Sequence, residues 1–194
     1  MPPVQKHDPE LVDRIASHYE EILRLIGEDP SREGLVKTPE RAAKALLDIT
    51  SGYRQDPLSV ARQAIFEHAG SRIVIVKDIE FYSMCEHHIL PFFGTVSIGY
   101  IPDGKMIGLS KLARIVDSFA KRLQVQERLT SRICNLLSEA MPTKGVIVSC
   151  TAQHLCMKMR GVEKQDSATT TYDYNGLFES DYSLREEFLK LIRE

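Results

Sequence analysis

The chain has 194 residues, of which 43% are hydrophobic and 27% charged, as is typical of a globular protein. Lys and Arg number 25 against 27 Asp and Glu, so the formal net charge of -2 disfavours a nucleic-acid-binding protein, which is usually basic. The polar N-terminus has no apolar signal core, and no stretch reaches the roughly 20 apolar residues of a membrane span. We therefore expect a cytoplasmic protein whose four Cys are core thiols, metal ligands or nucleophiles rather than disulfides.

Two amphipathic helices are expected near the N-terminus. Residues 9–27 carry apolar side chains at helical spacing, and Gly27 ends the pattern. A second helix is expected to begin at Thr38-Pro39, with Thr38 as its cap, and to end near residue 50. Residues 53–70 are expected to be partly helical. We assign residues 1–70 to an N-terminal helical extension and residues 71–194 to the main domain.

The main domain has two strand patterns, then two helical patterns, then two more strand patterns. Strands are expected over 73–79, 92–101, 146–157 and 168–174, because these runs are rich in β-branched and aromatic residues. Between the second and third strands come two helical patterns, and a closing helix is expected over 183–192. This order predicts an α+β fold, a four-stranded antiparallel sheet with two helices packed on one face.

Cys85 and His88 are three residues apart in an expected loop, close enough to bind one ion. A catalytic zinc site uses three protein ligands and leaves a position for water. The best third candidate is Cys156, because strand periodicity places it on one face with His154 and Arg160. Spacing alone leaves the alternative of buried core thiols open, since unpaired Cys is among the most buried residue types.

Other polar residues suggest proton transfer and anion binding. His87 and His154 flank the expected metal ligands and could act as acid or base, or could only orient a ligand. Lys111 and Arg114 lie in the first turns of an expected helix, and Arg160 could join them at phosphates, although a solvated cationic face is the simpler interpretation. Gln126 and Glu127 begin the next helix, and could be first-turn residues or could recognise a purine edge.

Taken together, these motifs resemble the GTP cyclohydrolase I family from about Thr38 to the C-terminal helix. The matching segments are Cys85-Glu86-His87-His88, Gly108-Leu109-Ser110-Lys111 with Arg114, Gln124-Val125-Gln126-Glu127-Arg128-Leu129-Thr130, and His154-Leu155-Cys156-Met157 with Arg160-Gly161. The resemblance implies a tunnelling fold and a toroidal homodecamer, with active sites at subunit interfaces that complete the exposed sheet edges. A regulatory protein, allosteric control, and folate or tetrahydrobiopterin as end product are left open.

The resemblance also implies roles for individual residues. Cys85, His88 and Cys156 would bind Zn²⁺, which lowers the pKa of water toward roughly 7 for attack on C8 of GTP. His154 would protonate N7, while His87 and Ser110 would assist at the ribose. Formate leaves, and an Amadori rearrangement and ring closure give 7,8-dihydroneopterin triphosphate. The substrate-binding residues implied by the resemblance are Gln126 and Glu127 for guanine, Lys111, Arg114 and Arg160 for the triphosphate, Leu109, and Arg41 from a neighbouring subunit.

Two positions depart from the pattern of many family members, which carry Lys and His where this chain has Thr95 and Ser97. Two alternatives compete with the leading hypothesis. One is a nitrile reductase of the same fold, which uses a Cys nucleophile and NADPH; His88 beside Cys85 argues against it. The other is a non-catalytic zinc protein, against which the presence of both His87 and His154 argues.

Overall fold

The computed structural model of the chain describes residues 7–70 and 72–193, so residues 1–6 of the expected extension lie outside the described part. The chain divides into two compact units, Met1–Ser51 and Gly52–Glu194. In the first unit, α1 (Pro9–Leu25) and α2 (Thr38–Ile49) pack through a small apolar cluster that includes Val12, Ala43 and Leu47. Both N-terminal helices are therefore present close to their expected bounds.

The expected cap of α2 is wrong. Thr38 is the first helical residue, and its hydroxyl donates to the Gly34 carbonyl at 3.4 Å instead of accepting from the helix. Lys37 occupies the cap position and makes no side-chain cap bond. Pro39 and Glu40 in the first turn still favour helix initiation, because proline is preorganised there and a carboxylate interacts well with the N-terminal end of the dipole.

The expected domain boundary at residue 70 falls inside the second unit. This unit already includes part of η1 (Ser51–Arg54) together with α3 (Pro57–Arg62) and β1 (Ile65–Glu67). Ala61 of α3 belongs to the main core, and β1 pairs antiparallel with β4 (Lys105–Ile107), with Ile65 opposite Ile107. Residues 52–70 therefore pack as part of the main domain.

A five-stranded sheet forms the second unit, with strand order β5-β2-β3-β6-β7. Its members are β5 (Leu123–Gln124), β2 (Val74–Cys85), β3 (Pro91–Pro102), β6 (Thr143–His154) and β7 (Thr169–Tyr174). The four long strands are antiparallel, as predicted. The short β5 adds a parallel pairing to β2, so the sheet has five strands instead of the expected four and is mixed rather than purely antiparallel. Strand β5 was not predicted because its two residues are too few to show the alternating pattern of a strand.

Strand β2 continues six residues beyond its expected end at residue 79. Its pairing with β3 shifts between Val76, opposite Ile98, and Ile79, opposite Val96, so β2 carries one extra residue there. Asp78 lies in this bulge with a φ of 58°. The polar pair Lys77-Asp78 therefore marks a bulge within the strand and not the strand's end.

Strand β6 begins and ends three residues earlier than expected. The sequence predicts a strand to residue 157, but β6 ends at His154 and α6 (Leu155–Lys158) follows as a single helical turn. The last pairings of β6 join His154 to Phe92 and Ala152 to Thr169. Within the part of the chain that the structure describes, no strand pairs with residues beyond His154, so the strand-face argument that placed Cys156 and Arg160 beside His154 was wrong.

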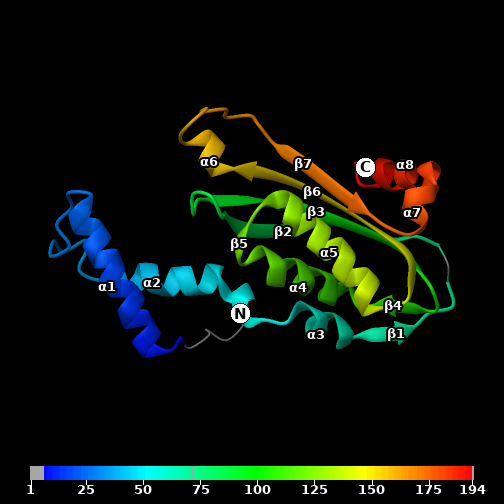
Figure 1. Cartoon of the computed structure of the whole chain (residues 1–194), viewed down its shortest axis with the longest axis horizontal. Coiled ribbons are helices and arrows are strands. Elements are labelled where there is room, and N and C mark those ends of the chain that lie inside the picture. The colour runs from blue at the N-terminus through cyan, green and yellow to red at the C-terminus, as the bar shows by residue number, and fades with distance from the viewer. Residues whose placement is uncertain (1–6, 71, 194) are drawn as a thin grey trace. The chain divides into compact units, whose positions relative to one another are not determined.

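Helices cover both faces of the sheet. On one face lie α4 (Leu109–Ala120) and α5 (Gln126–Ala140), as predicted (Figure 1). Their buried side chains, among them Leu112, Ile115, Leu129 and Ile133, share one core with alternate residues of β3 and β6. On the other face, Phe178 of α7 (Leu177–Ser180) and Phe188 of α8 (Tyr182–Leu191) pack in a second cluster. Among the described residues, no helix combines the length and apolar character needed to cross a membrane.

Candidate functional site

Three potential metal ligands converge at one end of the sheet. Cys85 is the last residue of β2, His88 lies in the turn to β3, and Cys156 lies in α6. One ligand atom from each of them lies within 4.8 Å of the other two, and Cys85 Sγ is 3.8 Å from His88 Nδ1. Two thiols and an imidazole are a donor set that suits zinc, and three protein ligands leave a coordination position for water.

A tight turn brings His88 back toward Cys85. The N–H of Ile89 donates to the Cys85 carbonyl at 2.8 Å, and the N–H of Cys85 donates to Leu90 at 2.9 Å. Ile89 adopts a φ of 53°, an uncommon conformation for a β-branched residue. Such strain is typical of functional sites, where the surrounding structure holds the backbone in place.

Cys156 reaches the cluster through the helical turn of α6. Burial raises the pKa of the Cys156 thiol, and the adjacent Cys85 raises this pKa further, while Arg160 lowers it. Arg160 itself is exposed. Two neighbouring thiols resist becoming thiolates together, and a bound cation would relieve that repulsion.

Two contacts fix the His154 side chain, one on a face of its ring and one at a ring nitrogen. Its ring stacks on Phe92 with a centroid distance of 4.6 Å and an interplanar angle of 3°. Its Nε2 lies 2.8 Å from Gln126 Oε1. Burial lowers the pKa of His154 below its ordinary value of 6.5, and the charge of Glu127 partly opposes this shift.

These groups line one pocket of about 230 Å³. Its lining residues are Cys85, His87, His88, Gln124, Val125, Gln126, Glu127, His154, Cys156, Met157 and Thr169. The structure thus brings together the predicted metal ligands, both predicted proton-transfer histidines and both predicted guanine-binding residues. Glu127 is exposed within this group, whereas Gln126 is buried.

The remaining predicted binding residues do not line this pocket. Leu109, Ser110, Lys111 and Arg114 lie in the first two turns of α4, as the sequence predicts, and Leu109 is 62% exposed. Lys111 Nζ donates to Gln63 Oε1 at 2.7 Å. Arg41 is exposed on α2, in the first unit.

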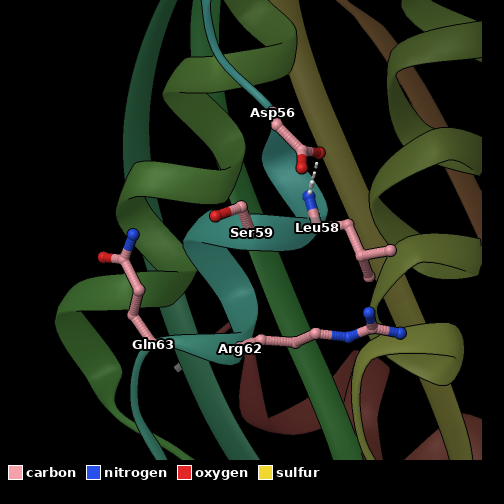
Figure 2. A pocket seen from close by; sticks show the side chains of 5 residues that line it. All are labelled: Asp56, Leu58, Ser59, Arg62 and Gln63. Atoms are coloured by element: carbon pink, nitrogen blue, oxygen red, sulfur yellow. Dashed lines mark hydrogen bonds between the residues drawn. The ribbon is translucent and has the colours of Figure 1, made fainter.

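A second pocket, of about 360 Å³, lies at α3 and is lined by Asp56, Leu58, Ser59, Arg62 and Gln63 (Figure 2). The carboxylate of Asp56 accepts from the Leu58 N–H at 3.1 Å and so caps α3. This pocket includes no Cys or His. We therefore assign no metal chemistry to it.

Sequence reasoning missed the link between the metal-ligand loop and α5. Arg128 donates to both carboxylate oxygens of Glu86, at 2.5 and 3.1 Å, and this holds the pKa of Glu86 below its ordinary value. The Glu86 N–H also donates to the Gln124 carbonyl at 3.1 Å. The charged neighbour of Cys85 and the Arg after Glu127 were visible in the sequence, but nothing in their spacing of 42 residues indicates contact.

Comparisons of the sequence with known proteins agree on one family. The sequence profile of the GTP cyclohydrolase I family matches residues 15–193. The chain belongs to the GTP cyclohydrolase I family. It is 56% identical over 183 residues to GTP cyclohydrolase 1 of Porphyromonas gingivalis, with 94% of each chain covered. It is 54% identical to the Bacteroides fragilis protein of that name, with 96% of this chain and 95% of the relative covered.

A more distant relative of the same name, from Chlorobium phaeovibrioides, is 53% identical over 95% of this chain and 82% of its own length. Among solved structures, the apo form of the archaeosine synthase QueF-Like matches 54% of this chain and 93% of its own, with 20% identity and a TM-score of 0.44. Similarity this low supports no conclusion about fold or activity. The family membership of the chain rests on its full-length sequence relatives.

The two Cys outside the site are expected to resist alkylation. Cys134 on α5 is 1% exposed and Cys150 on β6 is fully buried, and burial raises the pKa of each to about 12. Since the thiolate is the nucleophile, neither should react with iodoacetamide at pH 8 in the folded protein. After treatment with a chelator, the partly exposed Cys156 should react first. Peptide mass spectrometry before and after unfolding checks this order, and early labelling of Cys134 or Cys150 would contradict it.

Proposed function

We propose that this chain is a zinc-dependent GTP cyclohydrolase I, which converts GTP to 7,8-dihydroneopterin triphosphate and formate. The observation that carries the proposal is one pocket in which Cys85, His88 and Cys156 converge beside His154 and Glu127. The relatives that share over half of its residues carry the name of this activity.

The donor set fits a zinc ion. Cys85, His88 and Cys156 would hold it, and three ligands leave one coordination position open. Zinc there would act as a Lewis acid and lower the pKa of water toward roughly 7. The loop that carries His88 and the turn that carries Cys156 set the spacing of the donors.

Substrate recognition is assigned to charged side chains, of which Glu127 lines the pocket and the others lie outside it. The carboxylate of Glu127 would accept hydrogen bonds from N1–H and the 2-amino group of guanine, and adenine lacks this pair of donors. Lys111, Arg114 and Arg160 would bind the triphosphate. Arg41 of a neighbouring subunit would join them, and Leu109 would line the binding site.

The proton-transfer steps are assigned to His154, His87 and Ser110. His154 would deliver a proton to N7 of guanine, which makes C8 susceptible to attack by water. A second water releases C8 as formate. His87 would move protons at the ribose ring oxygen and Ser110 would assist there. The ribose rearranges, and closure of the new ring releases one water.

We further propose a homodecamer with the tunnelling fold, active in the cytoplasm at the entry to folate or tetrahydrobiopterin synthesis. The exposed Leu109 and the position of Ser110, Lys111 and Arg114 outside the pocket support a site that a second subunit completes. Light scattering or analytical ultracentrifugation measures the oligomer size directly.

GTP turnover by the purified protein tests the proposal. We expect formate and a pterin that becomes fluorescent on oxidation, loss of both with a chelator, and recovery on addition of zinc. Zinc binding without either product would support a non-catalytic zinc protein instead. Reduction of a nitrile with NADPH in the absence of metal would support the nitrile reductase alternative.

A further inference from the structure

The side-chain amide of Gln126 is fixed in one orientation by buried acceptors. Gln126 is 2% exposed, and its Nε2 lies 3.0 Å from the Cys150 carbonyl and 2.9 Å from the Thr169 carbonyl. A third contact joins Nε2 to Thr171 Oγ1 at 3.3 Å. Reversing the amide would place its oxygen against two carbonyl oxygens, with no hydrogen between them. The hydrogen-bond network therefore assigns nitrogen to the inner position and oxygen to the side facing His154.

This orientation determines which nitrogen of His154 carries the proton. Gln126 Oε1 lies 2.8 Å from His154 Nε2, and a carbonyl oxygen can only accept. His154 Nε2 must therefore be the protonated nitrogen. Among the described residues, Nδ1 of His154 has no hydrogen-bond partner. Stacking on Phe92 fixes the plane of the ring, so the direction in which Nδ1 points is fixed as well.

We propose that Gln126 is a positioning residue for His154, and that it does not read the guanine base. It holds His154 with Nε2 protonated and leaves Nδ1 as the nitrogen that takes up a proton and then passes it to the substrate. This inference rests on the proposed function, in which His154 protonates N7. It reassigns Gln126 because both faces of its amide are already occupied inside the protein, whereas the exposed carboxylate of Glu127 is available to the base.

Steady-state kinetics separate the two roles. Gln126→Met keeps the length of the side chain and removes its acceptor and donors. As a positioning residue, Gln126 should affect kcat, which we expect to fall by about 10–100-fold, with KM for GTP within about threefold. The matched control is Glu127→Gln, in the neighbouring residue assigned to guanine, for which KM should rise at least about tenfold. A rise in KM with unchanged kcat in Gln126→Met would overturn the proposal.

Neutron diffraction from the wild-type protein in deuterated buffer tests the inference without a variant or turnover. We expect deuterium on His154 Nε2, none on Nδ1 at alkaline pH, and the ND₂ group of Gln126 facing the carbonyls of Cys150 and Thr169. A bare Nε2 or a reversed amide would overturn the inference even if the enzyme proves active. If the protein shows no GTP turnover, the proposed function fails, and the diffraction result still decides how Gln126 and His154 are paired.

Discussion

Replacing Cys156 with alanine is expected to abolish GTP turnover by removing the metal. Only two of the three converging donors, Cys85 and His88, would remain. Loss of a residue that merely orients a ligand commonly weakens metal affinity by about 10–100-fold, so loss of a direct ligand should weaken it more. The zinc content of the purified variant, measured by inductively coupled plasma mass spectrometry, should fall far below one zinc per chain. Formate release should fall with it.

The matched control is Cys134→Ala. Cys134 is equally a thiol, but it lies in the core of α5 and its Sγ contacts Asn175 and the Val146 carbonyl. This substitution should lower the free energy of unfolding by about 1 kcal/mol, because it removes only one buried thiol group. It should leave the zinc content unchanged. Full zinc occupancy in Cys156→Ala, with normal folding, would remove Cys156 from the ligand set.

Among glycine-to-alanine substitutions in the sheet, Gly94→Ala is expected to destabilise the protein most. A Cβ at Gly94 would lie 2.0 Å from the Thr151 carbonyl oxygen and 2.7 Å from Ala152 Cα, both in the backbone of β6. Neither atom can move without disturbing the pairing of β3 with β6. We expect the free energy of unfolding to fall by about 3 kcal/mol, measured by urea denaturation at fixed protein concentration.

Gly104→Ala serves as the control for this measurement. Gly104 has a φ of 77°, but no atom outside its two chain neighbours lies within 4 Å of its added Cβ. Its cost should therefore be only the backbone strain, about 1 kcal/mol. Equal losses in the two variants would mean that the close approach of β3 and β6 is not what requires glycine at position 94.

Periodicity predicted the helices better than the strands. The apolar faces of α4 and α5 were correct because each repeats over several turns, and Leu112, Ile115, Leu129 and Ile133 are all fully buried. The strands were placed correctly in order, but the bounds of β2 and β6 were not. A polar pair within β2 suggested an end where the chain only bulges, and the end of β6 depends on where its neighbours stop, which is not written in its own residues.

The site was predicted in part. The spacing of Cys85 and His88 follows directly from one tight turn, so sequence alone could suggest it. Cys156 was chosen with an incorrect strand argument, yet the turn of α6 brings it to the same cluster. The stacking of Phe92 on His154 and the pairing of Glu86 with Arg128 depend on register between distant segments. No local pattern contains that information.

The extra residue in β2 also decides where Cys85 points. Before the bulge, even-numbered residues such as Val74 and Val76 pack toward the main core, and after it the odd-numbered Ile79, Phe81 and Cys85 do. The insertion therefore reverses the parity of the strand. Without it, the same residues would direct the Cys85 thiol to the opposite side of the sheet, away from Cys156. A backbone irregularity at Asp78, seven residues from the thiol, thus selects the side of the sheet on which the site can form.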